Sequence, residues 1–425
     1  MKLFTWSRNV RLFITSVLDQ VLLSAGNFLI GFLLIRHTTD FDYGLFVLVQ
    51  SAILLLVSTQ SSCVSGPLTV VVPHKTPEKR AEMIGSIERS LRRVISSVAV
   101  AAFVVPIVCY VRGTWDGLET LVVVLAIFAG WVALVRDYAR GILLILARPH
   151  TLLYADIVYV AIMVCGALFS VFGPVAAVLS AVGTLLLAGA AGWFAAYHAV
   201  GRDPGWHGNA AIAGPYWAEL RSLGIWSAVG SVVYWLYGQS YNYMLASRLD
   251  LTAVADVNAA RLLLMPSFIL TTGIKSLLAP LAANWLAKEG TGAMLRRVWL
   301  IVPAIVLLNL CYMILIWFGR DLITTDLLHK VIRDREMLLV MWAAIVLVTL
   351  IRDMLQAAVI VLGRLQSLAW LSAASAMVAL PMIWFGIGHW GAAGALIGQI
   401  CGEGVSLMGV LWLLPKAVKR YERER

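Results

Sequence analysis

The chain has 425 residues, of which 61% are hydrophobic and 13% charged, and its formal net charge is +10 at pH 7. A soluble domain has about 45–50% apolar and about 25% charged residues, so this composition excludes a soluble globular protein and predicts a polytopic membrane protein. Five cysteines stand singly in apolar segments, which favours small core residues over metal or disulfide sites, and no cofactor is expected.

Twelve apolar segments are long enough to cross a bilayer, for which about 20 residues are needed. We therefore predict an all-α membrane protein of about 12 transmembrane helices. In chain order the segments are 12–35, 43–72, 94–111, 120–146, 151–172, 175–199, 223–246, 253–285, 298–318, 337–362, 367–387 and 390–414.

Two stretches, one in each half of the chain, share their polar residues. Each has Arg-Asp, ten intervening residues and a second Arg, and the two copies are 216 residues apart. Polar matches inside apolar helices are rarer by chance than leucine matches, so the repeat indicates two halves descended from one unit. The matched pairs are Arg136 and Arg352, Asp137 and Asp353, and Arg148 and Arg364.

Weaker matches extend this repeat and define the predicted domains. Gly26 and Arg36 match Gly238 and Arg248 at an offset of 212 residues. Equivalent segments separated by an even number of crossings keep their orientation, so the repeat is parallel, with its pseudo-axis along the membrane normal. We predict a six-helix bundle at 1–199, a cytoplasmic linker at 200–222 and a second six-helix bundle at 223–425.

The orientation follows from Lys and Arg in the loops and near the ends of the spans. One side of the predicted topology holds 24 of these residues and the other side holds 7. The positive-inside rule therefore places both termini in the cytoplasm. The cationic side also favours contact with anionic lipid, and nothing indicates nucleic acid. The outer loop 319–336 opposes the trend because it holds four cations.

Local patterns predict the shapes of several helices. Residues 73–93 begin a helix at Pro77, and its apolar face lies opposite its basic residues. We expect this short helix to lie on the inner leaflet, with a plain connector as the alternative. Pro67 and Pro280 are expected to kink spans 2 and 8. A stripe of glycines spaced by four, Gly394, Gly398 and Gly402, indicates close helix packing.

We select ten charged residues inside the predicted spans as functional candidates, since each would cost about 2.5–3.5 kcal/mol near a helix centre. Five are acidic and five are basic, so they must pair, line a water-filled cavity or lie nearer the surface. They are Asp19, Arg136, Asp137, Arg140, Asp256, Arg261, Lys275, Arg352, Asp353 and Glu403.

Arg136, Arg140 and Arg352 allow two interpretations. Arginine is well suited to bind phosphate, so these side chains are candidates for an inner-leaflet anion site. The alternative is a salt bridge between helices, or anchoring at the cytoplasmic side by the positive-inside rule. Successive residues of a helix point about 100° apart, so we expect each Arg and the Asp that follows it to point in different directions.

Span 8 carries a second candidate site. Arg261 and Lys275 lie within about 40° of the same helix face, so they would form a cationic stripe across the membrane. In the alternative, Lys275 extends to the cytosol and Arg261 pairs with Asp256 or Glu403. Intramembrane carboxylates are functional candidates by default, so Asp19, Asp256 and Glu403 are the predicted sites for a coupling proton or sodium ion.

Several short motifs resemble those of bacterial polysaccharide repeat-unit flippases (Wzx-like). These proteins belong to the multidrug/oligosaccharidyl-lipid/polysaccharide (MOP) exporter superfamily. The similarity extends over the whole chain, although each motif is diffuse. It rests on Asp19-Gln20, Gly26-Asn27, Arg36, Tyr43-Gly44 and the run Asp256-Val257-Asn258-Ala259-Ala260-Arg261.

The resemblance implies two six-helix bundles around a central cavity with alternating access. The cargo would be an undecaprenyl-diphosphate-linked oligosaccharide, moved from the cytoplasmic to the periplasmic leaflet of the bacterial inner membrane for O-antigen or exopolysaccharide synthesis. An H⁺ or Na⁺ gradient would drive it, and polysaccharide polymerase and export proteins would be its partners. The residues expected to meet the diphosphate are Arg261, Lys275, Arg136, Arg140 and Arg352.

Two other functions remain as alternatives. A multidrug exporter of the same superfamily would use Asp19 for ion coupling and carry amphiphilic cations. An integral membrane glycosyltransferase would use an acidic pair such as Asp40 and Asp42, which form a D-x-D motif in the first outer loop. That loop is short, and a polar hairpin between helices is the favoured interpretation of the motif.

Overall fold

The computed structural model describes residues 2–72, 75–146, 148–173, 176–200 and 214–424. The regular structure in these residues is helical throughout. Within the described residues, nine helices are long and apolar enough to cross a membrane, or ten when the bent pair Leu251–Leu263 and Met265–Thr271 is counted as one span. Each predicted segment falls on a helix, so the chain is an all-α, multi-pass membrane protein, as the sequence predicts.

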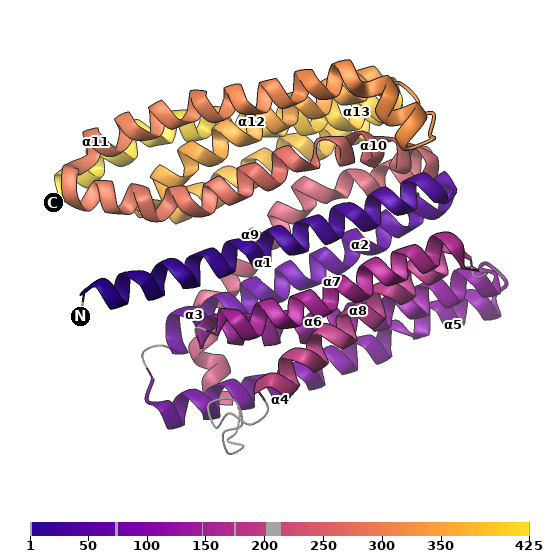
Figure 1. Cartoon of the computed structure of the whole chain (residues 1–425), viewed down its shortest axis with the longest axis horizontal. Coiled ribbons are helices and arrows are strands. Elements are labelled where there is room, and N and C mark those ends of the chain that lie inside the picture. The colour runs from indigo at the N-terminus through magenta and orange to yellow at the C-terminus, as the bar shows by residue number, and fades with distance from the viewer. Residues whose placement is uncertain (1, 73–74, 147, 174–175, 201–213, 425) are drawn as a thin grey trace. The chain divides into compact units, whose positions relative to one another are not determined.

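The chain divides into two compact units, Met1–Val232 and Val233–Arg425, and within each unit long helices lie alongside one another (Figure 1). Of the predicted linker 200–222, residues 201–213 lie outside the described part of the chain. The first unit contains α1 (Lys2–His37), α2 (Asp40–Gln60), η1 (Ser61–Ser65), α3 (Gly66–Val71), α4 (Pro77–Ala102), α5 (Val104–Val111), α6 (Gly117–Ile145), α7 (Pro149–Phe172) and α8 (Ala177–Val200).

The second unit begins within α9 and contains two helices that each turn back on themselves. At 1.5 Å per residue, α13 would be about 90 Å long, three times the hydrocarbon core, if it were straight. It instead turns at Trp390–Gly391, and α11 turns at Gly290, where the glycine has φ 84°. The helices are α9 (Gly214–Arg248), α10 (Leu251–Leu263), α11 (Met265–Asp321), η3 (Leu322–Leu327), α12 (Arg335–Val361) and α13 (Leu365–Glu424).

The 216-residue repeat is visible in the backbone of two turns. After α6, the Arg148 N–H donates to the Leu143 carbonyl at 2.9 Å. After α12, the Arg364 N–H donates to the Val359 carbonyl at 3.3 Å. In each case the arginine is the residue immediately before the next helix. The two matched stretches therefore have the same local fold as well as the same polar residues.

The helix predicted from Pro77 begins there, but it does not form a separate surface element. It continues unbroken to Ala102 as α4, so it is the first part of the third span. Ile84 and Ile87 are fully buried in the core of the first unit, and the Tyr138 hydroxyl donates to the Ile84 carbonyl at 2.8 Å. The expectation of a helix lying on the inner leaflet is wrong because its apolar face packs against protein.

The two predicted kinks have different outcomes. In span 2, the π-helical turn η1 directly precedes Pro67, so the helix is irregular there. In span 8, a 56° bend separates α10 from the start of α11, and Pro266 is the second residue of α11. Proline lacks an N–H and clashes with the preceding turn, which explains the break. The expected kink at Pro280 stays a prediction: the backbone is helical there, and the Pro280 side chain lies outside the described part of the structure.

The predicted glycine packing is confirmed in the hairpin of α13. A Cβ atom on Gly394 would overlap the backbone of Gly386, and a Cβ atom on Gly398 would overlap the backbone of Ile383. The two arms of the hairpin therefore approach too closely for any side chain at these positions, as small-residue stripes allow.

Candidate functional site

A buried carboxylate of α7 joins two arginines of α6. Asp156 is fully buried and accepts a hydrogen bond from Arg140 Nε at 2.8 Å and another from Arg136 Nη2. Arg140 Nη2 also donates to Asp19 Oδ2 of α1 at 3.0 Å. The two arginines are one helical turn apart and share a face, so one carboxylate reaches both.

This cluster contains more carboxylates than guanidinium groups. Asp137 lies within electrostatic range of both Arg136 and Arg140, so three acids face two bases. One oxygen of Asp19 and one of Asp137 are buried without a hydrogen-bond partner among the described residues. With every group ionised, the cluster carries one net negative charge, which a proton or a small cation would neutralise. The Arg136 guanidinium also lies 3.5 Å from the centre of the Tyr159 ring.

Asp156 is a functional candidate that the sequence analysis missed. It lies near the start of the apolar segment 151–172, so from sequence it resembles a residue at the membrane boundary of a span. The default interpretation of an intramembrane carboxylate as functional would have identified it. Its exposed fraction is 0%, so it lies deeper in the protein than its place in the sequence indicates.

The second unit contains a comparable cluster between α12 and α13. Arg352 Nε and Nη2 donate to Asp353 Oδ1 at 3.0 and 2.8 Å, and Arg352 Nη1 donates to Glu403. The expectation that Arg352 and Asp353 point in different directions is wrong because the long arginine side chain folds back to its neighbour. Two carboxylates therefore bind one guanidinium here.

Arg261 has a different environment, made of aromatic rings and a hydroxyl group. Its guanidinium lies 5.4 Å from the centre of the Trp342 ring and 5.6 Å from that of Phe268. Its Nη1 lies 3.4 Å from the Tyr241 hydroxyl, which in turn donates to Asn258 Oδ1 at 3.2 Å. Arg261 Nε is buried and has no hydrogen-bond partner in the described part of the chain.

Residues of the run 256–261 form hydrogen bonds to the helices that surround Arg261. Trp342 Nε1 donates to the Val257 carbonyl at 2.9 Å, which fixes the indole of α12 against α10. Asn258 Nδ2 donates to Asn242 Oδ1 at 2.7 Å, which joins α10 to α9. Both asparagines are buried, so this satisfied polar network specifies how the three helices pack around Arg261.

The predicted stripe along span 8 is not continuous. Arg261 lies on α10, and Lys275 lies on α11 beyond the 56° bend, so the two do not share one face of a straight helix. The Lys275 side chain lies outside the described part of the structure. Within the described residues, Arg261 forms no ion pair with either of its two predicted partners. Asp256 Oδ2 lies 3.9 Å from Arg333 Nε, and Glu403 binds Arg352.

The acidic residues of the D-x-D motif lie at the start of α2. Thr39 is the N-cap residue, and its hydroxyl accepts from the Asp42 N–H at 3.1 Å and donates to Asp42 Oδ2 at 2.8 Å. Acidic residues in the first turn also favour the positive end of the helix dipole. The motif therefore forms part of the capped first turn of a helix in this structure.

Comparisons with known proteins identify related folds. No family model matches the sequence, and no curated protein matches it. An inward-facing multidrug resistance MATE family transporter of the MOP superfamily superposes with a TM-score of 0.76 at 12% identity, covering 95% of this chain and 96% of that one. The lipid II flippase MurJ, in an inward closed conformation, gives 0.71 at 9% identity, covering 97% and 90%. An outward-facing MATE transporter gives 0.69 at 14% identity, covering 98% and 97%. These superpositions show that the chain shares the fold of these transporters.

Proposed function

We propose that this chain is an ion-coupled flippase of the MOP type. Its cargo is an undecaprenyl-diphosphate-linked oligosaccharide, moved from the inner to the outer leaflet of the bacterial cytoplasmic membrane for polysaccharide synthesis. The observation that carries this proposal is the environment of Arg261, a partly buried cation that forms no ion pair with a carboxylate in the described part of the chain.

Arg261 is suited to a diphosphate because two aromatic rings lie beside its guanidinium group and its Nε–H has no hydrogen-bond partner in the described part of the chain. Guanidinium groups bind phosphate oxygens in a bidentate manner, and aromatic faces stabilise the cation without neutralising it. Arg136, Arg140 and Arg352 already bind carboxylates, so they are secondary contacts that need a rearrangement of their clusters. Lys275 on α11 is the second proposed contact.

Carboxylates of the two clusters supply the proposed coupling. Uptake of a proton or sodium ion at Asp19 in the first unit, or at Glu403 in the second, would weaken the buried ion pairs with Arg140 and Arg352. A ligand shifts a conformational equilibrium only by its differential affinity for the two states. Ion binding would therefore drive alternating access if one state leaves these carboxylates without their arginines. Asp256, near Arg333, is the third proposed ion site.

The proposed setting follows from the distribution of cations. Both termini lie in the cytoplasm, the membrane lipids surround the helices, and polysaccharide polymerase and export proteins receive the product. One structural neighbour is named as a lipid II flippase, which supports lipid-linked cargo for the shared fold.

A multidrug exporter is the second candidate, and a specific observation favours it. The cluster of the first unit has three carboxylates and two arginines, so its charged residues do not by themselves oppose a cationic cargo. Two of the structural neighbours are multidrug resistance transporters.

The test is mass spectrometry of membrane lipids after the protein is depleted from its host. We expect undecaprenyl-diphosphate carrying a completed repeat unit to accumulate and secreted polysaccharide to fall. Wild-type protein should restore both, and Arg261→Gln at equal expression should not. Arg297→Gln is the matched control, because Arg297 is an exposed arginine paired with Glu289.

The other outcomes separate the candidates. An unchanged carrier-lipid pool with increased retention of dyes would replace the flippase with the multidrug exporter. Accumulation of a shortened glycan would instead indicate a glycosyltransferase, and Asp40 and Asp42 would become the residues to mutate.

A further inference from the structure

The last part of α13 has two different faces. Val410, Leu414 and Ala417 are buried in the core of the second unit. The opposite face carries exposed side chains that lie within about 80° of one another at 3.6 residues per turn. In chain order these side chains, which we call the α13 stripe, are Met408, Trp412, Lys416, Lys419 and Arg423.

The α13 stripe changes from apolar to cationic within one helical turn. Met408 and Trp412 are 68% and 65% exposed, so both present a large apolar surface away from the protein core. The Lys416 ammonium lies 3.1 Å from the centre of the Trp412 ring, which stabilises the cation without neutralising it. Tryptophan is enriched at the membrane–water interface. Trp412 therefore marks the level at which α13 leaves the hydrocarbon core.

The cations of the α13 stripe are not neutralised by carboxylates. Within the described residues, Lys416, Lys419 and Arg423 form no ion pair. Glu422 lies on another side of the helix and accepts a hydrogen bond from the Thr291 hydroxyl of the α11 turn at 2.6 Å. Three positive charges along one helix face are therefore open to an anion from outside the protein.

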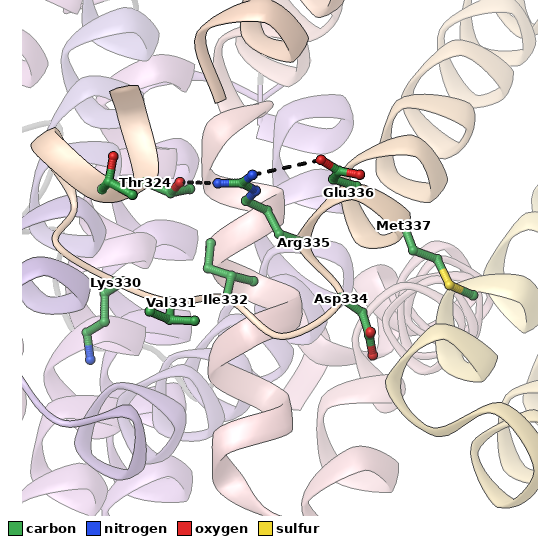
Figure 2. Close-up of a pocket in the computed structure, with 9 residues that line it drawn as sticks. Thr324, Lys330, Val331, Ile332, Asp334, Arg335, Glu336 and Met337 are labelled. Atoms are coloured by element: carbon green, nitrogen blue, oxygen red, sulfur yellow. Dashed lines mark hydrogen bonds and ion pairs between the residues drawn. The ribbon is translucent and has the colours of Figure 1, made fainter. Parts of the chain in front are cut away.

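The cations at the opposite end of the second unit differ, because they are paired. In the turn between α11 and α12, Arg335 Nη2 donates to Asp321 Oδ1 at 2.6 Å. Arg320 Nε donates to Glu336 Oε1 at 3.0 Å. Figure 2 shows the Arg335 guanidinium between Thr324 and Glu336. These arginines are satisfied within the turn, whereas the α13 stripe leaves its cations to an external partner.

The α13 stripe extends beyond the layer of phospholipid head groups. A bilayer is about 40–45 Å thick and its hydrocarbon core about 30 Å, which leaves about 5–8 Å for the head groups on each side. At 1.5 Å per residue, Lys416 lies about 6 Å beyond Trp412 along the helix. Lys419 lies about 10 Å and Arg423 about 16 Å beyond it. An anion that meets all three cations must therefore project out of the head-group layer.

We propose that the α13 stripe binds the head of a polyprenyl diphosphate lipid, at a site separate from Arg261. The prenyl chain lies against Met408 and Trp412. Lys416 and Lys419 bind the two phosphates as point charges, and the first sugar lies further along the stripe. A glycerophospholipid has its phosphate within the head-group layer, whereas a diphosphate carries its second charge further from the membrane.

The identity of this lipid rests on the proposed function, and the site adds a step to it. The proposed topology places the end of α13 in the cytoplasm, where the cargo lipid is made. The α13 stripe would therefore be a first contact for the lipid on the cytoplasmic side, before translocation.

Native mass spectrometry of the full chain tests this inference. The Arg261→Gln background is used, so that lipid at the proposed cargo site does not mask the α13 stripe. The protein is incubated with undecaprenyl diphosphate, undecaprenyl monophosphate or phosphatidylglycerol. We expect undecaprenyl diphosphate to bind about tenfold more tightly than either other lipid, the effect of one further charge-assisted contact. Equal binding of the three lipids would indicate general contact with anionic lipid and would overturn the inference.

A double variant locates the site. Lys416→Gln with Lys419→Gln removes two exposed cations of the α13 stripe and should weaken binding of undecaprenyl diphosphate about tenfold or more. Lys79→Gln with Arg93→Gln is the matched control, because it removes two exposed cations of α4 in the first unit, and it should leave binding unchanged. Equal affinities for the stripe double variant and its parent would contradict the assignment.

The wild-type chain separates this inference from the proposed function. If both hold, wild type binds two molecules of undecaprenyl diphosphate, and either Arg261→Gln or the stripe double variant binds one. Loss of one lipid only in the stripe double variant would refute the Arg261 site and support the α13 stripe. Loss of one lipid only in Arg261→Gln would refute the α13 stripe.

Discussion

Arg136 and Arg352 hold equivalent places in the 216-residue repeat, yet they pair with carboxylates from non-equivalent helices. Arg136 binds Asp156 of α7, and Arg352 binds Glu403 in the second arm of α13. The positions that repeat these partners hold Ser372 and Leu187, which have no carboxylate. Each half has therefore kept the repeated arginine and acquired its own partner for it.

Removing Asp156 should destabilise the first unit strongly. The Asp156→Ala variant leaves Arg136 and Arg140 buried with one carboxylate partner fewer, and breaking a buried pair in this way costs about 3–5 kcal/mol. Thermal unfolding in detergent should show a clearly lower midpoint than wild type. Glu78→Ala, at an exposed acid of α4, is the control and should leave the midpoint nearly unchanged. Equal midpoints for Asp156→Ala and wild type would contradict the buried cluster.

The Arg352–Glu403 pair should be strongly coupled. Each single replacement by leucine leaves the other buried charge with one opposite charge fewer, so the double variant should be more stable than the sum of the single effects predicts. A double-mutant cycle should give a coupling energy of about 1–3 kcal/mol. The exposed pair Arg297 and Glu289 is the comparison and should give less than about 1 kcal/mol. Similar coupling energies for the two pairs would count against a buried interaction.

The hairpin of α13 should not tolerate side chains at its glycine contacts. Gly398→Ala forces a methyl group into the backbone of Ile383, and overpacking of this kind costs about 1–3 kcal/mol or more. The folded yield and unfolding midpoint should fall. At Gly404 a Cβ atom meets nothing within 4 Å, so Gly404→Ala is the matched control on the same helix. A neutral Gly398→Ala would mean that the arms are more widely spaced.

Asp19 should be required for ion coupling. Asp19→Asn keeps the size of the side chain but removes its charge, so Arg140 loses an ionised partner and the cluster loses its excess carboxylate. Cargo movement in reconstituted vesicles should then become insensitive to an imposed proton or sodium gradient. Asp42→Asn, at the helix cap of α2, should remain gradient-dependent. Full gradient dependence in Asp19→Asn would remove this residue from the coupling mechanism.

The helices and the repeat could be predicted from sequence because their signals are local. Apolar length identifies a span without knowledge of its neighbours, and the Arg148 and Arg364 turns repeat within short stretches. Close packing in α13 also follows from the local spacing of Gly394 and Gly398. These features need no information about which helices become neighbours.

The ion pairs and the bend in span 8 could not be predicted in the same way. The partner of Arg352 is 51 residues away on another helix, so the pairing depends on the assembled bundle. The proposed stripe of Arg261 and Lys275 assumed a straight helix, whereas Pro266 breaks it between them. Attention to Pro266 would have corrected this, because proline without an N–H weakens the preceding turn.

The most direct test of the proposed function is leaflet exchange of a polyprenyl-diphosphate oligosaccharide in vesicles that contain the purified protein. We predict that wild-type protein exposes the sugar of the inner-leaflet lipid to an external lectin, and that Arg261→Gln slows this exchange about tenfold or more. Arg297→Gln should match wild type. No exchange by wild type, or equal rates for wild type and Arg261→Gln, would contradict the proposal that Arg261 carries the diphosphate.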